Sequence, residues 1–279
     1  MARLFGLLGN RADLTGRVLA FEREALRVKN GGAGGAVGWG LGFYQGGEVL
    51  IRRRPIDERD DIDVAQLGAD VRAEIVVGHV RQPTVGTLRT ENTHPFRYRQ
   101  WLYAQTGTVS SFDQTRDRLV QSVPEFLRAG IRGDSDAEIV FQVFLSFLHD
   151  AGKLDDLIVD VGVVHEAIRG TLRVVDAISA EVGGEPAEVN LIVSNGDIVV
   201  AAHRRKKMAL RTFAGRDDAE ALIGDDQLVR RRTPELAQVQ FALVASDFDT
   251  ETLPPRWNAV KDRAMVSLTR AAAPKIEDL

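Results

Sequence analysis

The chain opens with an apolar, strand-like run over residues 2–8, directly after Met1. Chain ends are usually polar and poorly ordered unless the fold ties them down. A strand this close to the start predicts that the terminus is built into the core. Enzymes that use their first residue as nucleophile need this arrangement, with Cys, Ser or Thr there and the α-amino group as a nearby base. Ala2 supplies the amine but no nucleophilic atom.

Composition and charge narrow the class of protein. The 279 residues are 44% hydrophobic and 27% charged, as in an ordinary globular chain, and we expect a single domain over residues 1–279. The absence of Cys excludes disulfides, zinc–thiolate sites and thiol nucleophiles, and it fits a cytoplasmic protein. No apolar stretch is long enough to cross a membrane, and we expect no membrane partner.

Basic residues cluster at 52–54, 204–207 and 230–232, although the formal net charge is −4. Aromatic residues do not interleave with these clusters, so we interpret them as solvated loops and strand ends and expect no nucleic-acid partner. His149, His165 and His203 are scattered along the chain. We therefore expect no metal site and no cofactor.

Hydrophobic periodicity and turn residues predict alternating strands and helices. Expected strands cover residues 2–8, 37–44, 48–53, 74–80, 102–104, 108–110, 188–194, 197–203, 241–245 and 265–268, and expected helices cover 13–28, 62–71, 113–129, 135–152 and 154–182. Gly46-Gly47 and Asn195-Gly196 are typical hairpin turns. Strands at both ends with long helices between them predict an α+β fold, with sheets packed together and helices outside.

Four short motifs follow one another in a specific order. They are GHVRQPT at residues 78–84, NTHPF at 92–96, YAQTGT at 103–108 and GDSDAE at 133–138. With the first strand and the strand over 38–44, they resemble the class II glutamine amidotransferases, in particular the small stand-alone branch that includes the ergothioneine-pathway amidohydrolase. The segment 245–247 and Trp257 extend the resemblance over nearly the whole chain. It implies the four-layer αββα sandwich of the N-terminal-nucleophile hydrolases.

The resemblance also implies which positions correspond to the catalytic ones. The family's nucleophilic Cys falls on Ala2, and its two oxyanion-hole positions fall on Thr106 and Gly107. The glycine is retained, whereas Thr106 stands where the family has Asn. The chain therefore departs from the family at two of the three catalytic positions.

The substrate-binding positions of the family fall on Arg81, Thr84 and Asp136. The resemblance implies that Arg81 grips the α-carboxylate of a substrate bidentately and that Asp136 takes its ammonium group. Taken alone, Arg81 is more typical of a loop anchored through backbone carbonyls, and Asp136 is also typical of a carboxylate at a helix start. Together, at the family's spacing, the two residues favour a binding pocket. His79 and His94, within the motifs, are expected to orient loops through hydrogen bonds.

Two interpretations of function stay open. In the first, the chemistry is lost naturally, and the protein binds glutamine or a γ-glutamyl compound, or serves an assembly as a homo-oligomer or with a protein partner. In the second, Ala2 replaces a natural Cys, and the native protein is an active amidotransferase or γ-glutamyl amidohydrolase. Thr106 favours the first, because replacing a nucleophile to trap a substrate would leave the oxyanion position unchanged.

Overall fold

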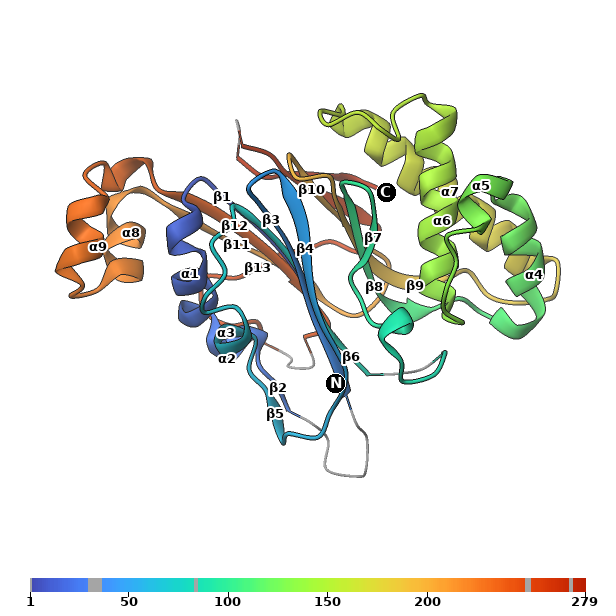
Figure 1. The fold of residues 1–279 in the computed structure, drawn as a ribbon, viewed down its shortest axis with the longest axis horizontal. Coiled ribbons are helices and arrows are strands. Elements are labelled where there is room, and N and C mark those ends of the chain that lie inside the picture. Colours follow the sequence, from blue (N-terminus) through green and yellow to red (C-terminus); the bar gives the residue numbers. More distant parts are fainter. Residues whose placement is uncertain (1, 30–36, 83–84, 249–251, 271–272) are drawn as a thin grey trace.

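The computed structural model describes residues 2–29, 37–82, 85–248, 252–270 and 273–279. Two β-sheets face each other, and helices cover the outer face of each sheet (Figure 1). Three hydrophobic clusters fill the spaces between the four layers, one between the sheets and one beneath each helical layer. The predicted α+β class and αββα sandwich are confirmed.

The first sheet has seven strands in the order β13-β11-β12-β1-β6-β3-β4, and all neighbours are antiparallel. Its strands are β1 (Arg3–Gly9), β3 (Val37–Gln45), β4 (Glu48–Asp57), β6 (Ile75–Arg81), β11 (Met208–Ala214), β12 (Gln240–Ser246) and β13 (Asn258–Val260). A separate two-stranded ribbon joins β2 (Val28–Lys29) to β5 (Asp61–Ile62).

The second sheet has six antiparallel strands in the order β15-β14-β10-β9-β8-β7. They are β7 (Phe96–Tyr98), β8 (Trp101–Thr108), β9 (Glu188–Ser194), β10 (Val199–His203), β14 (Ala264–Leu268) and β15 (Lys275–Asp278). Strands β8 and β9 carry the longest pairing of this sheet, from Leu102 opposite Ser194 to Thr108 opposite Glu188.

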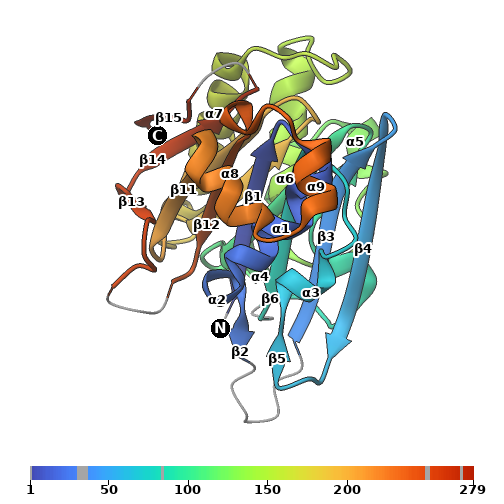
Figure 2. The same ribbon diagram turned by 90° about the vertical axis from the view of Figure 1, so that its left-hand side faces the viewer.

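Helices of two groups form the outer layers. The first sheet is covered by α1 (Thr15–Phe21), α2 (Arg23–Leu26), α3 (Val64–Leu67), α8 (Gly215–Ile223) and α9 (Gln227–Arg232), which lie in front of it in Figure 2. The second sheet is covered by α4 (Phe112–Ser122), α5 (Glu125–Arg128), α6 (Asp136–Asp150) and α7 (Val161–Ala180). None of the helices within the described ranges is both long and apolar enough to span a bilayer.

The opening apolar run becomes β1, which lies between β12 and β6 near the centre of the first sheet. Phe5 and Leu7 pack beneath the helices, whereas Leu4 and Leu8 pack between the two sheets. Because both faces of the strand are buried, its sequence is apolar throughout rather than alternating. The prediction that the start of the chain is built into the core is confirmed.

Several predicted helices are shorter than expected or broken. The helix over 13–28 is interrupted at Glu22, whose carboxylate accepts hydrogen bonds from Arg211 and Trp257. The helix over 113–129 breaks before Pro124, because proline disfavours helical geometry in Val123, which has φ −86° and ψ 135°. The helix over 154–182 begins only at Val161, and that over 62–71 retains only α3.

The prediction of two short strands on either side of Gly107 is wrong, because β8 runs through this residue as one strand. Gly107 has a φ of +97°, a conformation that side chains disfavour. A Cβ atom there would lie 2.0 Å from the Glu188 carbonyl oxygen on β9. Glycine at this position therefore lets the backbones of β8 and β9 approach closely, and β8 continues through Gly107 instead of ending there.

Candidate functional site

The predicted site residues gather at one end of the two sheets. Strand β1 starts there with Arg3 opposite Val80, and β6, β8 and β12 end there (Figure 1). A cavity of about 70 Å³ lies at this end. Its lining residues are Ala2, His79, Arg81, Gln82, Val85, His94, Gln105, Thr106, Gly107, Ser135, Asp136, Ala137, Arg205, Lys206 and Asp247. We call it the Ala2 cavity.

The structure brings Ala2, Arg81, Thr106, Gly107 and Asp136 together around this one cavity. They come from the first residues of the chain, the end of β6, the end of β8 and the first turn of α6. Thr84, the remaining predicted binding residue, lies outside the described residues. The juxtaposition of the other five is a tertiary feature that their spacing along the chain does not by itself reveal.

No thiol lines this cavity. Ala2 contributes a methyl group, and the chain contains no Cys. The Ser135 hydroxyl accepts a hydrogen bond from the Glu138 amide at 3.4 Å and caps α6. Ser135 and Glu138 thus form half of a capping box, because the Glu138 carboxylate instead accepts from the Arg132 and Gly133 amides.

Thr106 is held by a buried carboxylate. Its hydroxyl donates to Asp247 Oδ2 at 2.6 Å, and the Ser246 hydroxyl donates to the same oxygen at 2.7 Å. Arg205 Nη1 donates to Asp247 Oδ1 at 2.8 Å. A hydroxyl has one proton, so Thr106 can only accept a further hydrogen bond from a ligand. An oxyanion requires donors, and Thr106 has none left for it.

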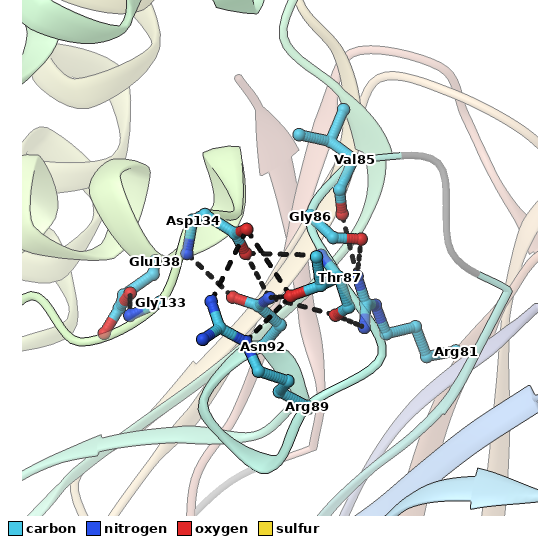
Figure 3. A network of polar contacts seen from close by, with 9 residues as sticks. All are labelled: Arg81, Val85, Gly86, Thr87, Arg89, Asn92, Gly133, Asp134 and Glu138. Carbon is cyan, nitrogen blue, oxygen red and sulfur yellow. Dashed lines mark hydrogen bonds and ion pairs between the residues drawn. The ribbon is translucent and has the colours of Figure 1, made fainter.

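Arg81 is anchored by the loop that follows it. Its guanidinium donates to the carbonyls of Thr87, Val85 and Gly86 at 3.1, 2.7 and 3.3 Å (Figure 3). These are the contacts expected of an arginine that anchors a loop through backbone carbonyls. They also fix the position of a cation at the wall of the Ala2 cavity, and no carboxylate lies within ion-pair distance of it in the described ranges.

A polar network holds this loop in turn. The Asn92 side-chain amide donates to the Thr87 carbonyl at 3.0 Å and to the Asp134 carboxylate, and Asn92 Oδ1 accepts from the Asp134 amide at 2.9 Å (Figure 3). Arg89 donates to the Thr87 hydroxyl at 2.8 Å and lies 3.6 Å from Asp134. The second and fourth sequence motifs thus meet in one network and position the loop that carries the Arg81 acceptors.

Asp136 lies at the start of α6 and is buried. Its carboxylate accepts from the Val109 amide at 2.8 Å and from the Ala137 amide at 2.9 Å. Burial raises the pKa of Asp136 to about 6, against these hydrogen bonds and the charge of Arg81, which lower it. The group is therefore predominantly ionised at pH 7, and each oxygen retains a lone pair for another donor.

His79 and His94 pack edge to face with ring centroids 4.4 Å apart. His79 Nδ1, both ring nitrogens of His94 and the amide nitrogen of Gln105 are buried and have no hydrogen-bond partner within the described part of the chain. Burial lowers the pKa of His79 to about 3 and that of His94 well below its usual value. The expectation that hydrogen bonds from these rings orient loops is wrong for His94.

Asp247 and Arg205 also line the cavity, although the sequence analysis assigned neither of them a role in the site. The run at 204–207 was interpreted as solvated, but Arg205 pairs with buried Asp247, and Arg204 pairs with Asp176 at 2.8 Å. Only the juxtaposition of residues 106, 205 and 247 shows the network. Within the described ranges, no three His, Asp or Glu side chains are grouped as a metal ion would require.

Comparisons with known proteins relate this chain to one family. The sequence model of the class II glutamine amidotransferases matches residues 1–276. The chain is 29% identical over 153 residues to the probable glutamine amidotransferase DUG3 of Saccharomyces cerevisiae, covering 50% of this chain and 42% of that protein. It is 29% identical over 169 residues to the γ-glutamyl-hercynylcysteine sulfoxide hydrolase of Mycobacterium tuberculosis, covering 58% and 67%. The match thus spans less than half of DUG3.

Solved structures share the fold at low sequence identity. A class II glutamine aminotransferase domain protein from Silicibacter pomeroyi superposes with a TM-score of 0.59 and 15% identity, over 99% of this chain and 98% of that one. The glutamine phosphoribosylpyrophosphate amidotransferase of B. subtilis superposes with a TM-score of 0.55 and 15% identity, over 99% of this chain and 49% of that one. These structures support the fold, and the family match over residues 1–276 confirms the resemblance inferred from the motifs.

Proposed function

This chain belongs to the class II glutamine amidotransferases, and on that basis we propose that it binds the amino-acid end of glutamine or of a γ-glutamyl compound without hydrolysing it. The observation that carries the proposal is the pairing of charges around the Ala2 cavity. Arg81 and Asp136 both line it, interact electrostatically and form no ion pair with each other in the described structure. A fixed cation and a fixed anion at one cavity complement the carboxylate and ammonium of an α-amino acid.

Two features support the absence of hydrolysis. Covalent amide cleavage needs a nucleophile, and Ala2 provides only a methyl group. It also needs donors aimed at the developing oxyanion, and the Thr106 proton is directed at Asp247. Both losses act on the reaction, whereas Arg81 and Asp136 act on recognition. The site therefore lacks the nucleophile and the oxyanion donor but retains the two charged side chains that could bind an amino acid.

The alternative function is an active amidotransferase or γ-glutamyl amidohydrolase in which Ala2 takes the place of a natural Cys. This alternative accounts for Ala2 alone. It leaves Thr106 unexplained, because the single hydroxyl proton of this residue is directed at Asp247 and is not available to an oxyanion. We therefore favour binding without hydrolysis.

Calorimetric titration with L-glutamine tests the proposal. We expect saturable binding with no ammonia release, and at least tenfold weaker binding in Arg81→Gln and in Asp136→Asn. Arg89→Gln is the matched control, since Arg89 lies in the same network but does not line the cavity. The cavity of about 70 Å³ is smaller than typical ligand sites of about 300–1,000 Å³, so we expect lining side chains to move on binding. Absence of binding by L-glutamine and by γ-glutamyl amides would refute the proposal.

The affinity for L-glutamine is also expected to depend on pH. Only ionised Asp136 pairs with the ligand's ammonium, and its pKa is about 6. The affinity should therefore be constant above pH 7 and fall about tenfold per pH unit well below pH 6, because the protonated group must first lose its proton. Titrations between pH 5 and 8 measure this, and Asp136→Asn should abolish the dependence. Equal affinity at pH 5 and 8 would contradict the role of Asp136.

A further inference from the structure

Thr106 and Asp247 form one wall of the Ala2 cavity, where β8 and β12 end. Both residues are buried, with 4% of Thr106 and 1% of Asp247 exposed. The Thr106 hydroxyl donates to Asp247 Oδ2 at 2.6 Å, and Arg205 Nη1 donates to Oδ1 of the same carboxylate at 2.8 Å. Because the ion pair with Arg205 keeps Asp247 ionised, the carboxylate can only accept, and the direction of the hydrogen bond from Thr106 is determined.

The side chains of Thr106 and Asp247 therefore present acceptors, and no donor, to a ligand. The one proton of the hydroxyl is used within the pair, and an ionised carboxylate has none. A ligand group that lies against Thr106 has to bring an N–H or O–H donor of its own. A group with acceptors alone would face the hydroxyl oxygen without a proton between them, which is costly in a buried site.

The charged residues of the lining do not reverse this preference. Arg205 is already paired with Asp247. Arg81 and Asp136 are the groups proposed for the two charges of the ligand's amino-acid end. Lys206 also lines the cavity, but it is exposed, and solvent and salt screen its charge. A second ligand carboxylate at this wall would therefore meet a hydroxyl acceptor with an ionised carboxylate 2.6 Å behind it.

We infer that the site selects a γ-group that donates a hydrogen bond, so that it binds γ-amides and rejects the γ-carboxylate of glutamate. The selection rests on the proposed function, in which Arg81 and Asp136 hold the amino-acid end of the ligand. Both residues line the same cavity of about 70 Å³ as Thr106, so the other end of a short ligand lies against the Thr106 hydroxyl. Thr106 thus determines the specificity, and Asp247 positions its proton.

Calorimetric titrations of the full chain at neutral pH with four ligands test this selection. L-Glutamine and γ-glutamyl methylamide carry an N–H donor at the γ-position, the γ-methyl ester of L-glutamate is neutral there and has no donor, and L-glutamate is charged and has no donor. We expect both amides to bind more tightly than the ester and glutamate by a factor of about ten or more. The ester is the matched control, because it separates the lack of a donor from the presence of a charge.

Variants at position 106 test the role of the hydroxyl. In Thr106→Asn, one N–H can bond to Asp247 and the other can donate to a ligand acceptor. We expect the preference for glutamine over the ester and glutamate to fall by a factor of about ten. Thr106→Ser keeps one hydroxyl with one proton and should retain the order of affinities, which controls for the change of side chain.

The outcomes separate the selection from the proposed function. If none of the four ligands binds, the proposed function fails, and the selection fails with it. Equal affinity for glutamine and glutamate would overturn the selection alone. Binding of the ester as tightly as of glutamine, with glutamate rejected, would assign the discrimination to charge and contradict the role of Thr106. An unchanged order of affinities in Thr106→Asn would contradict that role as well.

Discussion

Introducing Cys at position 2 and Asn at position 106 together is expected to produce glutamine hydrolysis, an activity that the unchanged protein lacks under the proposed function. Ala2→Cys supplies a thiol beside the α-amine, after removal of Met1, at the wall of the cavity that Arg81 and Asp136 line. Thr106→Asn supplies a donor at the position where the Thr106 hydroxyl now points at Asp247. The two changes restore the two chemical functions that the site lacks.

The physical reason for requiring both changes is the number of protons at position 106. The Thr106 hydroxyl has one, and Asp247 Oδ2 accepts it at 2.6 Å. An asparagine amide has two N–H donors, so one can remain on Asp247 while the other points to an oxyanion. Loss of one such donor in a serine protease costs about 10²–10³ in kcat. We therefore expect Ala2→Cys alone to be about 10²–10³-fold slower than the double variant.

Ammonia release from L-glutamine measures this prediction, with intact-mass analysis to establish that residue 2 is the first residue of the purified variants. Ala2→Cys with Thr106→Val is the matched control, since valine has the shape of threonine and no donor. Hydrolysis by the unchanged protein would contradict the loss of chemistry and support the active alternative. A double variant no faster than Ala2→Cys alone would show that position 106 does not face the oxyanion.

Strands and turns that depend on a local sequence pattern were predicted closely from the sequence. The run over residues 2–8 became β1, and the hairpin became β3 and β4 around Gly46 and Gly47, which have φ values of +61° and +80°. A two-residue hairpin turn of type I′ needs positive φ at both central positions, and glycine adopts this conformation readily. The turn and the strands therefore agree with each other in the sequence.

Strand β11 shows why other elements were not predicted. It follows the charged run at 204–207 and contains Arg211, which interrupts its apolar pattern. In the structure, Arg211 is buried, and its Nε donates a hydrogen bond to the Glu22 carboxylate at 3.1 Å. Glu22 lies 189 positions earlier in the chain. A charged side chain is compatible with a buried strand only through such a partner. No local pattern contains that information.

The same distinction applies to the site. Ala2, Arg81, Thr106, Gly107 and Asp136 were found because each lies in a short motif that resembles a known family, and the structure places all five at one cavity. Asp247 and Arg205 become informative only through their contact with Thr106. That contact changes the interpretation of Thr106 from a substituted residue to a hydroxyl held by a carboxylate, which explains why an oxyanion is disfavoured there.

The second large effect is expected at acid pH, where burial of His79 and His94 should make the protein unstable. Burial lowers the pKa of His79 to about 3, and the charge of Arg81 adds to this. An unfolded histidine titrates near 6.5, so the unfolded state binds the proton more strongly. Stability from this group is therefore complete above about pH 6.5 and decreases as pH falls toward 3. For His79 alone, the loss at pH 5 is about 2 kcal/mol.

Asp136 changes the stability of the protein in the opposite direction to His79 over part of the same pH range. Its folded pKa is raised to about 6, so its contribution to stability is complete below the unfolded value of about 3.9 and decreases as pH rises toward 6. The two groups partly compensate each other between about pH 4 and 6. A comparison of histidine variants with the unchanged protein cancels the Asp136 contribution, because Asp136 is present in both.

His79→Leu and His94→Leu should each reduce the loss of unfolding free energy between pH 8 and pH 5, by about 2 kcal/mol for His79. Leucine is similar in volume, and it also removes ring nitrogens that lack hydrogen-bond partners in the described structure. Urea unfolding at the two pH values, extrapolated to water, measures the difference. The exposed His149 on α6 provides the control, since His149→Leu removes a histidine from the surface and leaves the buried pair unchanged. Equal losses in His79→Leu and the unchanged protein would show that the buried pair does not determine acid stability.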